Sequence, residues 1–250
     1  MPDGMHFEGH AEVYGEARPP YPVELWNTVR DLGVLEPGCS AVDLGAGTGQ
    51  ATGPLLAAGM RVTAVEPGPR LAARMRTAYP AATVIQERAE TVRVPDRSFD
   101  LAVAATSIHW MDLDLVLPRV HRWLRPSGLL LVWRNVFGDP AATLTPFRQR
   151  IAQIVAERDA PPRPGNAEDL AEAALALTRA GLFSLESTHT YRWSMELDQR
   201  QVHRLFTTFS DWSPEEVERA AAAVADLGGR VVENYASWLI VTRRQERPAQ

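Results

Sequence analysis

Short apolar runs alternate with amphipathic segments between residues 39 and 135. The apolar runs predict buried strands at 40–45, 61–66, 82–87, 99–107 and 129–135. Helical spacing of apolar residues predicts helices at 50–59, 69–79 and 113–124. Gly59 and Pro80 stand where two of these helices are expected to end. Strands separated by single helices indicate right-handed crossovers and a parallel sheet covered on both faces.

The C-terminal part has a different pattern. Helical segments at 145–158 and 166–181 flank a stiff, proline-rich linker. Two later strands are predicted at 182–193 and 231–244. Between them, 213–229 predicts a helix with Ser213 as N-cap and Glu216 completing a capping box.

We therefore predict one α/β domain over residues 1–250, with a Rossmann-like, doubly wound sheet. Its expected parts are an N-terminal helical segment at 1–30, a cofactor-binding core at 40–135, a helical cap at 140–181 and C-terminal strands and helices at 182–244. We expect the cap to stand over the carboxyl edge of the sheet.

Composition narrows the functional classes. The net charge of −5 does not favour a nucleic-acid partner. All 26 cationic side chains are arginines, so Schiff-base catalysis and a P-loop lysine are excluded. Cys39 is the single cysteine, which rules out an internal disulfide and favours a reducing cytoplasm. We expect neither a membrane span nor a secretion signal.

A glycine-rich loop, "DLGAGTGQ" (43–50), follows the first predicted strand. A dinucleotide fingerprint would have glycine or alanine where Gln50 stands. Asp43 lies two residues before the first glycine, where a carboxylate would repel a pyrophosphate. It suits a cationic ligand instead, and the sulfonium and ammonium of S-adenosylmethionine are cationic.

Acidic residues also follow the next two strands. Glu66 ends the second strand at about the distance expected for an acid that binds ribose hydroxyls. Pro67 is placed to pack on an adenine face, and "ERAE" (87–90) is placed to bind the adenine edge through the Ala89 backbone and Glu90. Arg88 and Glu90 would equally form a surface ion pair.

The segments "VDLGAGTG", "VTAVEP", "RAETVRVPDRSFDLAVAATSIHWMD" and "VHRWLRPSGLLLVW" resemble the class I S-adenosylmethionine-dependent methyltransferases of the type 11 group. The early "YGEARPPYP" (14–22) resembles a segment of the same group. The resemblance implies a seven-stranded sheet whose last strand is antiparallel. It also implies that Tyr14 and Arg18 close over the cofactor, with the arginine near its carboxylate. Glu87 and Arg88 depart from many members of the group, so adenine recognition is assigned to the Ala89 backbone.

The expected cofactor site combines the glycine loop with the ends of the neighbouring strands. Its residues are Tyr14, Arg18, Asp43, Gly45, Ala46, Gly47, Thr48, Gly49, Gln50, Glu66, Pro67, Ala89, Glu90, Ala105 and Thr106.

His109 is the candidate general base because it follows the fourth strand, where ligands of such sheets bind. The alternative is that His109 and Trp110 only line the pocket. No metal site is expected, since His6 and His10 lack further ligands nearby.

The sequence thus predicts a cytoplasmic enzyme that methylates an O, N or C atom of a small molecule, with S-adenosylmethionine as cofactor and no nucleic-acid or membrane partner. Two alternatives stay open: an inactive S-adenosylmethionine-binding scaffold or regulator, and an NAD(P)-dependent oxidoreductase.

Overall fold

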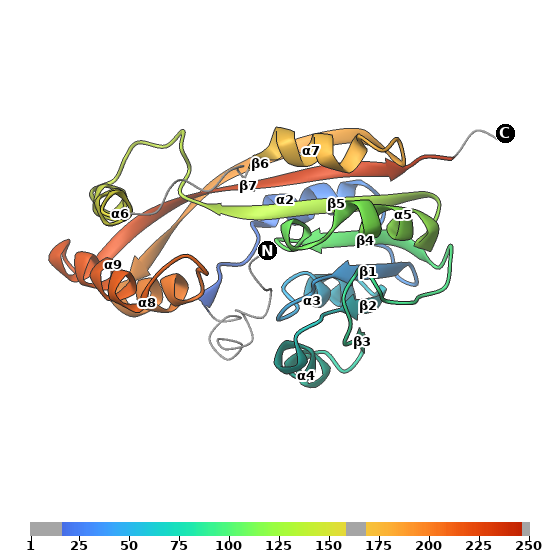
Figure 1. The fold of residues 1–250 in the computed structure, drawn as a ribbon, viewed down its shortest axis with the longest axis horizontal. Coiled ribbons are helices and arrows are strands. Elements are labelled where there is room, and N and C mark those ends of the chain that lie inside the picture. The colour runs from blue at the N-terminus through green and yellow to red at the C-terminus, as the bar shows by residue number, and fades with distance from the viewer. Residues whose placement is uncertain (1–16, 159–168, 247–250) are drawn as a thin grey trace.

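The computed structural model describes residues 17–158 and 169–246. Among these residues, seven strands form one mixed sheet in the order β3-β2-β1-β4-β5-β7-β6 (Figure 1). The strands are β1 (Ser40–Leu44), β2 (Arg61–Val65), β3 (Thr83–Ile85), β4 (Phe99–Ala105), β5 (Leu124–Phe137), β6 (Phe183–Asp198) and β7 (Arg230–Arg244). The helices are α2 (Val23–Asp31), α3 (Thr52–Ala57), α4 (Pro69–Ala78), α5 (Leu113–Trp123), α6 (Pro146–Ala156), α7 (Leu170–Thr178), α8 (Gln199–Thr207) and α9 (Pro214–Asp226).

Strand pairing confirms the predicted fold class. β1 pairs in parallel with β2 and β4, and the parallel pairing continues to β3 on one side and β5 on the other. β7, the last strand in the chain, lies antiparallel between β5 and β6. The carboxyl ends of the five parallel strands therefore share one edge, which is where ligands bind in open α/β sheets.

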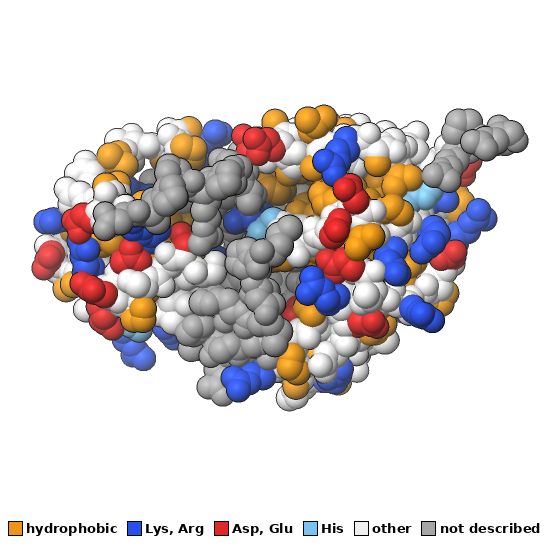
Figure 2. Space-filling view, in the orientation of Figure 1, with side chains coloured by type: hydrophobic (Ala, Val, Ile, Leu, Met, Phe, Trp, Pro, Cys, Tyr) orange, Lys and Arg blue, Asp and Glu red, His pale blue; other side chains and the backbone are white. Residues whose placement is uncertain are grey.

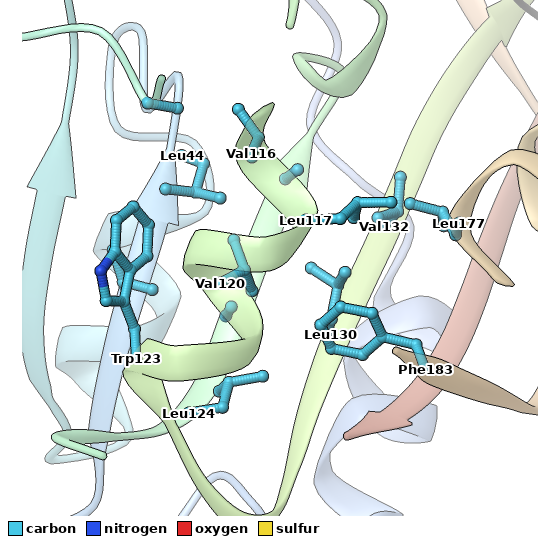
Figure 3. Close-up of a cluster of buried hydrophobic side chains, with 14 of the residues drawn as sticks. Leu44, Val116, Leu117, Val120, Trp123, Leu124, Leu130, Val132, Leu177 and Phe183 are labelled. Carbon is cyan, nitrogen blue, oxygen red and sulfur yellow. The ribbon is translucent and has the colours of Figure 1, made fainter. Parts of the chain in front are cut away.

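Helices cover both faces of the sheet. α5 packs on one face through Val116, Val120 and Trp123, and α7 lies beside it with Leu177 in the same cluster (Figure 3). On the opposite face, α2 contributes Leu25 and α3 contributes Leu55 to a second buried cluster. The near-continuous apolar character of β1 and β4 follows from this double coverage.

The remaining helices form a lobe at one end of the molecule. The long strands β6 and β7 extend beyond the rest of the sheet toward α6, α8 and α9 (Figure 1). There, apolar side chains of the three helices pack with both strands, in a cluster of Phe147, Ile151, Ile154, Leu197, Val202, Leu205, Phe206, Val217, Ala220, Ala223, Val224 and Val231. We call α6, α8 and α9 the helical lobe.

The two helices expected to form one cap at 140–181 lie in different parts of the structure. α6 belongs to the helical lobe, whereas α7 packs on the sheet beside α5 because Ala174 and Leu177 join the core cluster there. α8 was not predicted, although Asp198 and Gln201 form a capping box at its start. The predicted capping box of Ser213 and Glu216 is present at the start of α9.

Two strands are longer than predicted. β5 begins at Leu124, because Leu124 pairs with Phe99 before the register shifts and Leu129 pairs with Leu101. β6 continues to Asp198, paired with β7 throughout its length. The extension of β6 brings its carboxyl end to the helical lobe, where Leu197 joins the buried cluster.

Candidate active site

A pocket opens at the carboxyl ends of the parallel strands, between the glycine loop and the helical lobe. Twelve of the predicted cofactor residues line it: Arg18, Gly45, Ala46, Gly47, Thr48, Gln50, Glu66, Pro67, Ala89, Glu90, Ala105 and Thr106. Tyr14 lies outside the described residues. Asp43, Gly49 and His109 are not among the lining residues.

Two glycines shape the turn after β1. A Cβ on Gly45 would lie 2.7 Å from the Ser107 Cβ, so glycine lets the turn approach the end of β4. Gly47 has a left-handed φ of 57°, and the nearest atom to a Cβ there would be the Gly45 carbonyl oxygen at 4.0 Å. The space beside Gly47 belongs to the pocket, and a side chain would fill this cradle.

Glu66 connects the glycine turn to the end of β2. One carboxylate oxygen accepts a 2.8 Å hydrogen bond from the Gly47 N–H, and the other accepts one from the Gly68 N–H, also at 2.8 Å. The side chain is largely buried yet lines the pocket. This carboxylate is therefore fixed beside the cradle, as a group that binds ribose hydroxyls must be.

Asp43 has a different role from the one expected. It is fully buried, and one carboxylate oxygen accepts a 2.7 Å hydrogen bond from the Thr52 hydroxyl at the start of α3. Burial, with a smaller contribution from Glu66, raises the pKa of Asp43 from 3.8 to about 7. Its place inside β1, followed by Leu44, directs it behind the loop, so it supports the turn without lining the pocket.

Gly49 and Gln50 complete the loop in different ways. The aromatic ring of Tyr79 occupies the space where a Gly49 side chain would lie, so Gly49 is needed for packing. The Gln50 amide donates to the Arg18 carbonyl oxygen at 3.1 Å. The Arg18 guanidinium in turn donates to the Thr208 carbonyl oxygen at 3.0 Å and lies 4.7 Å from the centre of the Phe209 ring. Arg18 thereby links the glycine loop to the helical lobe.

The region beyond β2 and β3 forms one end of the pocket. Pro67 and Leu71 line it on one side, and Ala89 and Glu90 line it on another. Glu90 pairs with Arg88 at 3.5 Å and accepts a 3.1 Å hydrogen bond from the Asp112 N–H. This combination of apolar faces and backbone groups is suited to a planar base.

Thr106 is held in an unfavourable backbone conformation at the end of β4. Its φ is 58°, which a β-branched residue seldom adopts, and its N–H donates to the Trp133 carbonyl oxygen at 2.8 Å. The Thr106 hydroxyl lies 2.9 Å from the Tyr21 hydroxyl. Such local strain is concentrated at functional sites, and here it turns the chain sharply along the pocket wall.

His109 lies in a short 3₁₀ turn, Ile108–Trp110, and its Nδ1 is 3.0 Å from an Arg134 guanidinium nitrogen. A guanidinium only donates, so Nδ1 accepts and the proton resides on Nε2. Burial, followed by the charges of Arg134 and Arg18, lowers the pKa of His109 to about 3. The imidazole is therefore neutral, and its free nitrogen carries a proton instead of a lone pair. This arrangement does not favour a base.

The sequence reasoning missed much of the pocket wall. Tyr21, Asn135, Phe137, Leu205, Phe209 and Tyr235 all line it. Tyr21 belongs to the "RPPYP" segment already recognised as a motif, which was a usable signal. The others depend on the register of β5 against β7 and on α8, and no local motif identifies them.

Neither metal-binding nor membrane-spanning features occur in the described parts of the chain. No group of three or more His, Cys, Asp or Glu side chains there is arranged to hold a metal ion. His6 and His10 lie outside these residues. None of the helices in 17–158 and 169–246 has both the length and the apolar character that crossing a bilayer requires. Acidic and basic side chains are intermingled on the face shown in Figure 2.

Comparison with known proteins finds a similarity in the sheet-forming core. Residues 42–132 match a family model described as a methyltransferase domain. An uncharacterized methyltransferase of Mycobacterium tuberculosis is 36% identical over 132 residues, which cover 52% of this chain and 53% of the relative. An uncharacterized methyltransferase of Schizosaccharomyces pombe is 24% identical over 229 residues, 90% of this chain and 86% of that protein. The chain spans about half the length of the mycobacterial relative that it matches.

Solved structures share the fold over most of the chain. A candidate type II methyltransferase of Anaeromyxobacter dehalogenans has a TM-score of 0.62 at 24% identity, covering 90% of this chain and 97% of its own. The [4+2]-cyclase SpnF has a TM-score of 0.58 at 19% identity, covering 98% of this chain and 95% of its own. At these identities the likeness shows a common fold.

The buried Asp43 carboxyl predicts a pH-dependent stability. Between 3.8 and about 7 the folded state holds a proton that the unfolded state has released, so the free energy of unfolding falls as pH rises. Asp43→Asn removes this titration, and we expect the slope between pH 5 and 7 to become shallower by up to ~1.4 kcal/mol per pH unit. Denaturant unfolding measured across this range checks the change.

The exposed Asp96 supplies the matched control, since Asp96→Asn makes the same chemical change at the surface. Burial also raises the pKa of Glu233 to about 7, so part of the dependence of stability on pH should remain in both variants. Equal slopes for Asp43→Asn and Asp96→Asn would contradict the assignment of a buried proton to Asp43.

Proposed function

We propose that the protein is a class I methyltransferase of the type 11 group, which transfers a methyl group from S-adenosylmethionine to a small acceptor molecule; the match of residues 42–132 to a methyltransferase domain supports this. The observation that carries the proposal is the cradle at Gly47, with the Glu66 carboxylate fixed beside it. The residues present there fit S-adenosylmethionine as the cofactor.

Different pocket residues are assigned to different parts of the cofactor. Glu66 is the acceptor for the ribose hydroxyls, and the end near Pro67, Leu71 and Ala89 takes the adenine. Arg18 is the group assigned to the carboxylate, because this residue lines the pocket between the glycine loop and α8 and carries a cationic side chain. These assignments follow the expected roles, apart from that of Asp43.

The oxidoreductase alternative loses its support at the same place. A pyrophosphate bound at the Gly47 N–H would meet the Glu66 carboxylate, which already accepts a hydrogen bond from that N–H. A dinucleotide fingerprint also has an acid for the ribose at this place, so the charge of Glu66 alone does not exclude NAD. The argument is that the Gly47 N–H already donates to Glu66 and is not free for a pyrophosphate.

S-adenosylmethionine supplies an activated methyl group on a sulfonium, so the protein's main task is to align the acceptor and exclude water. Holding two reactants in line lowers a barrier by about 7–11 kcal/mol. Trp110 and Met111 line the pocket on the side of β4, and Phe137 and Phe209 line it on the side of the helical lobe. These largely apolar side chains would exclude water from the part of the pocket in which the acceptor is positioned.

The activity is tested with S-adenosylmethionine labelled in its methyl carbon and a panel of small metabolites. We expect labelled product and S-adenosylhomocysteine in equal amounts. Gly47→Val, verified as folded by circular dichroism, should abolish both, because its side chain occupies the cradle. Binding of S-adenosylhomocysteine without transfer to any member of a broad panel would favour the scaffold alternative.

We propose that His109 positions neighbouring groups through its bond to Arg134 and does not act as a base. Glutamine both accepts and donates a hydrogen bond, so His109→Gln should keep kcat within about tenfold of wild type, with an unchanged pH profile between pH 5.5 and 8. A loss of about 10²–10⁴-fold, together with the disappearance of an acidic limb near pH 6.5, would instead establish a general base.

A further inference from the structure

The side of the pocket next to the helical lobe is apolar and aromatic. Phe137 of β5, Leu205 of α8 and Phe209 after α8 line it. The ring centres of Phe137 and Phe209 are 5.4 Å apart, and those of Phe137 and Tyr235 are 5.7 Å apart. This wall fits an apolar body of about the size of a ring.

Tyr235 is held rigidly in this wall. The sheet register places it between Phe137 of β5 and Trp193 of β6. The Trp193 and Tyr235 rings are stacked, with centres 4.6 Å apart and planes inclined by 14°. The Trp193 indole N–H donates to the Ser237 hydroxyl at 2.8 Å, which in turn donates to the Asn135 amide oxygen at 2.6 Å. The phenol ring is therefore fixed by packing and by its neighbours' hydrogen bonds.

The Tyr235 hydroxyl makes no hydrogen bond with any described residue, although its oxygen is buried and the side chain is only 2% exposed. Other buried or half-buried tyrosines of this region differ: the Tyr21 hydroxyl contacts Thr106, and the Tyr191 hydroxyl donates to Thr28 at 2.7 Å. Leaving a buried hydroxyl without a partner destabilises the folded protein. Because Tyr235 lines the pocket, a bound molecule can supply the missing partner.

Charges around Tyr235 decide which partner is favoured. Burial and the nearby Glu233 carboxyl raise its pKa above the ordinary range, so the hydroxyl stays protonated and can donate. The Arg18 and Arg148 guanidinium groups also act on it, and Arg18 lines the pocket. Glu233 is fully buried, pairs with Arg148 at 3.5 Å and does not line the pocket. Among the described residues that line this side of the pocket, Arg18 is the charged one, and a guanidinium attracts an anionic oxygen and repels an ammonium group.

We propose that the Tyr235 hydroxyl is the specificity-determining donor for the methyl acceptor, and that the acceptor is a small, largely apolar molecule carrying an anionic oxygen, as in a carboxylate or phenolate. The inference rests on the proposed function and names the substrate class of the same site. It assigns no proton transfer to Tyr235, which holds the acceptor in place.

Binding of 4-hydroxybenzoate to protein saturated with S-adenosylhomocysteine tests the proposal, with 4-hydroxybenzylamine as the cationic probe of equal size. We expect the carboxylate probe to bind more tightly than the amine. Tyr235→Phe should weaken 4-hydroxybenzoate binding by about 10- to 150-fold, since one hydrogen bond to a charged group is lost. It should leave the affinity for S-adenosylhomocysteine unchanged. Calorimetric titration measures the affinities for the carboxylate probe, the amine probe and S-adenosylhomocysteine.

Tyr191→Phe is the matched control, because it removes a tyrosine hydroxyl that is bonded to Thr28 and lies outside the pocket lining. Without a ligand, Tyr235→Phe should unfold at the same temperature as wild type or a higher one, since it removes an unsatisfied buried group. Lowered thermal stability, no effect on 4-hydroxybenzoate binding, tighter binding of the amine or binding of neither probe would overturn the proposal. Failure of every variant to bind S-adenosylhomocysteine would instead overturn the proposed function.

Discussion

The hydrogen bond from the Gly47 N–H to the Glu66 carboxylate joins the two parts of the protein on which the site depends. It exists because β1 and β2 run parallel in a register that pairs Leu44 with Val65. The glycine turn and the acid, separated along the chain, therefore leave the sheet side by side. Asp43 supports the turn from behind by binding Thr52 at the start of α3. The position of the cradle beside Glu66 is thus a consequence of the register between β1 and β2.

The helical lobe completes the pocket from a part of the chain remote in sequence. The antiparallel insertion of β7 between β5 and β6 carries Tyr235 and Phe137 to the pocket and places α8 against it. Arg18 bridges the two sides, since its carbonyl oxygen accepts from Gln50 and its guanidinium donates to Thr208. In the proposed function, the core binds the cofactor and the lobe contacts the methyl acceptor.

The sequence predicted those features that local patterns determine. Gly45, Gly47 and Glu66 stand at or just after the ends of predicted strands, so the strand ends predicted from the sequence also locate these residues. Asp43 was misplaced because an acid in an apolar run was taken as a ligand contact, whereas it is a buried carboxyl bonded to Thr52. α8 had a readable signal in Asp198, Gln201 and the apolar spacing of Val202, Leu205 and Phe206. The place of Tyr235 in the pocket lining had no such signal, because it depends on pairing with strands that are distant in the chain.

Calorimetric titration with S-adenosylhomocysteine and with NAD, on wild type, Glu66→Gln and Glu87→Gln, tests the central claim most directly. Glu87 is exposed at the end of β3 and does not line the pocket, so its variant controls for loss of charge. We expect wild type and Glu87→Gln to bind S-adenosylhomocysteine equally and NAD not at all, with Glu66→Gln weaker by about 1.5–3 kcal/mol. Binding of NAD without S-adenosylhomocysteine, or equal affinities for the two glutamine variants, would contradict the account.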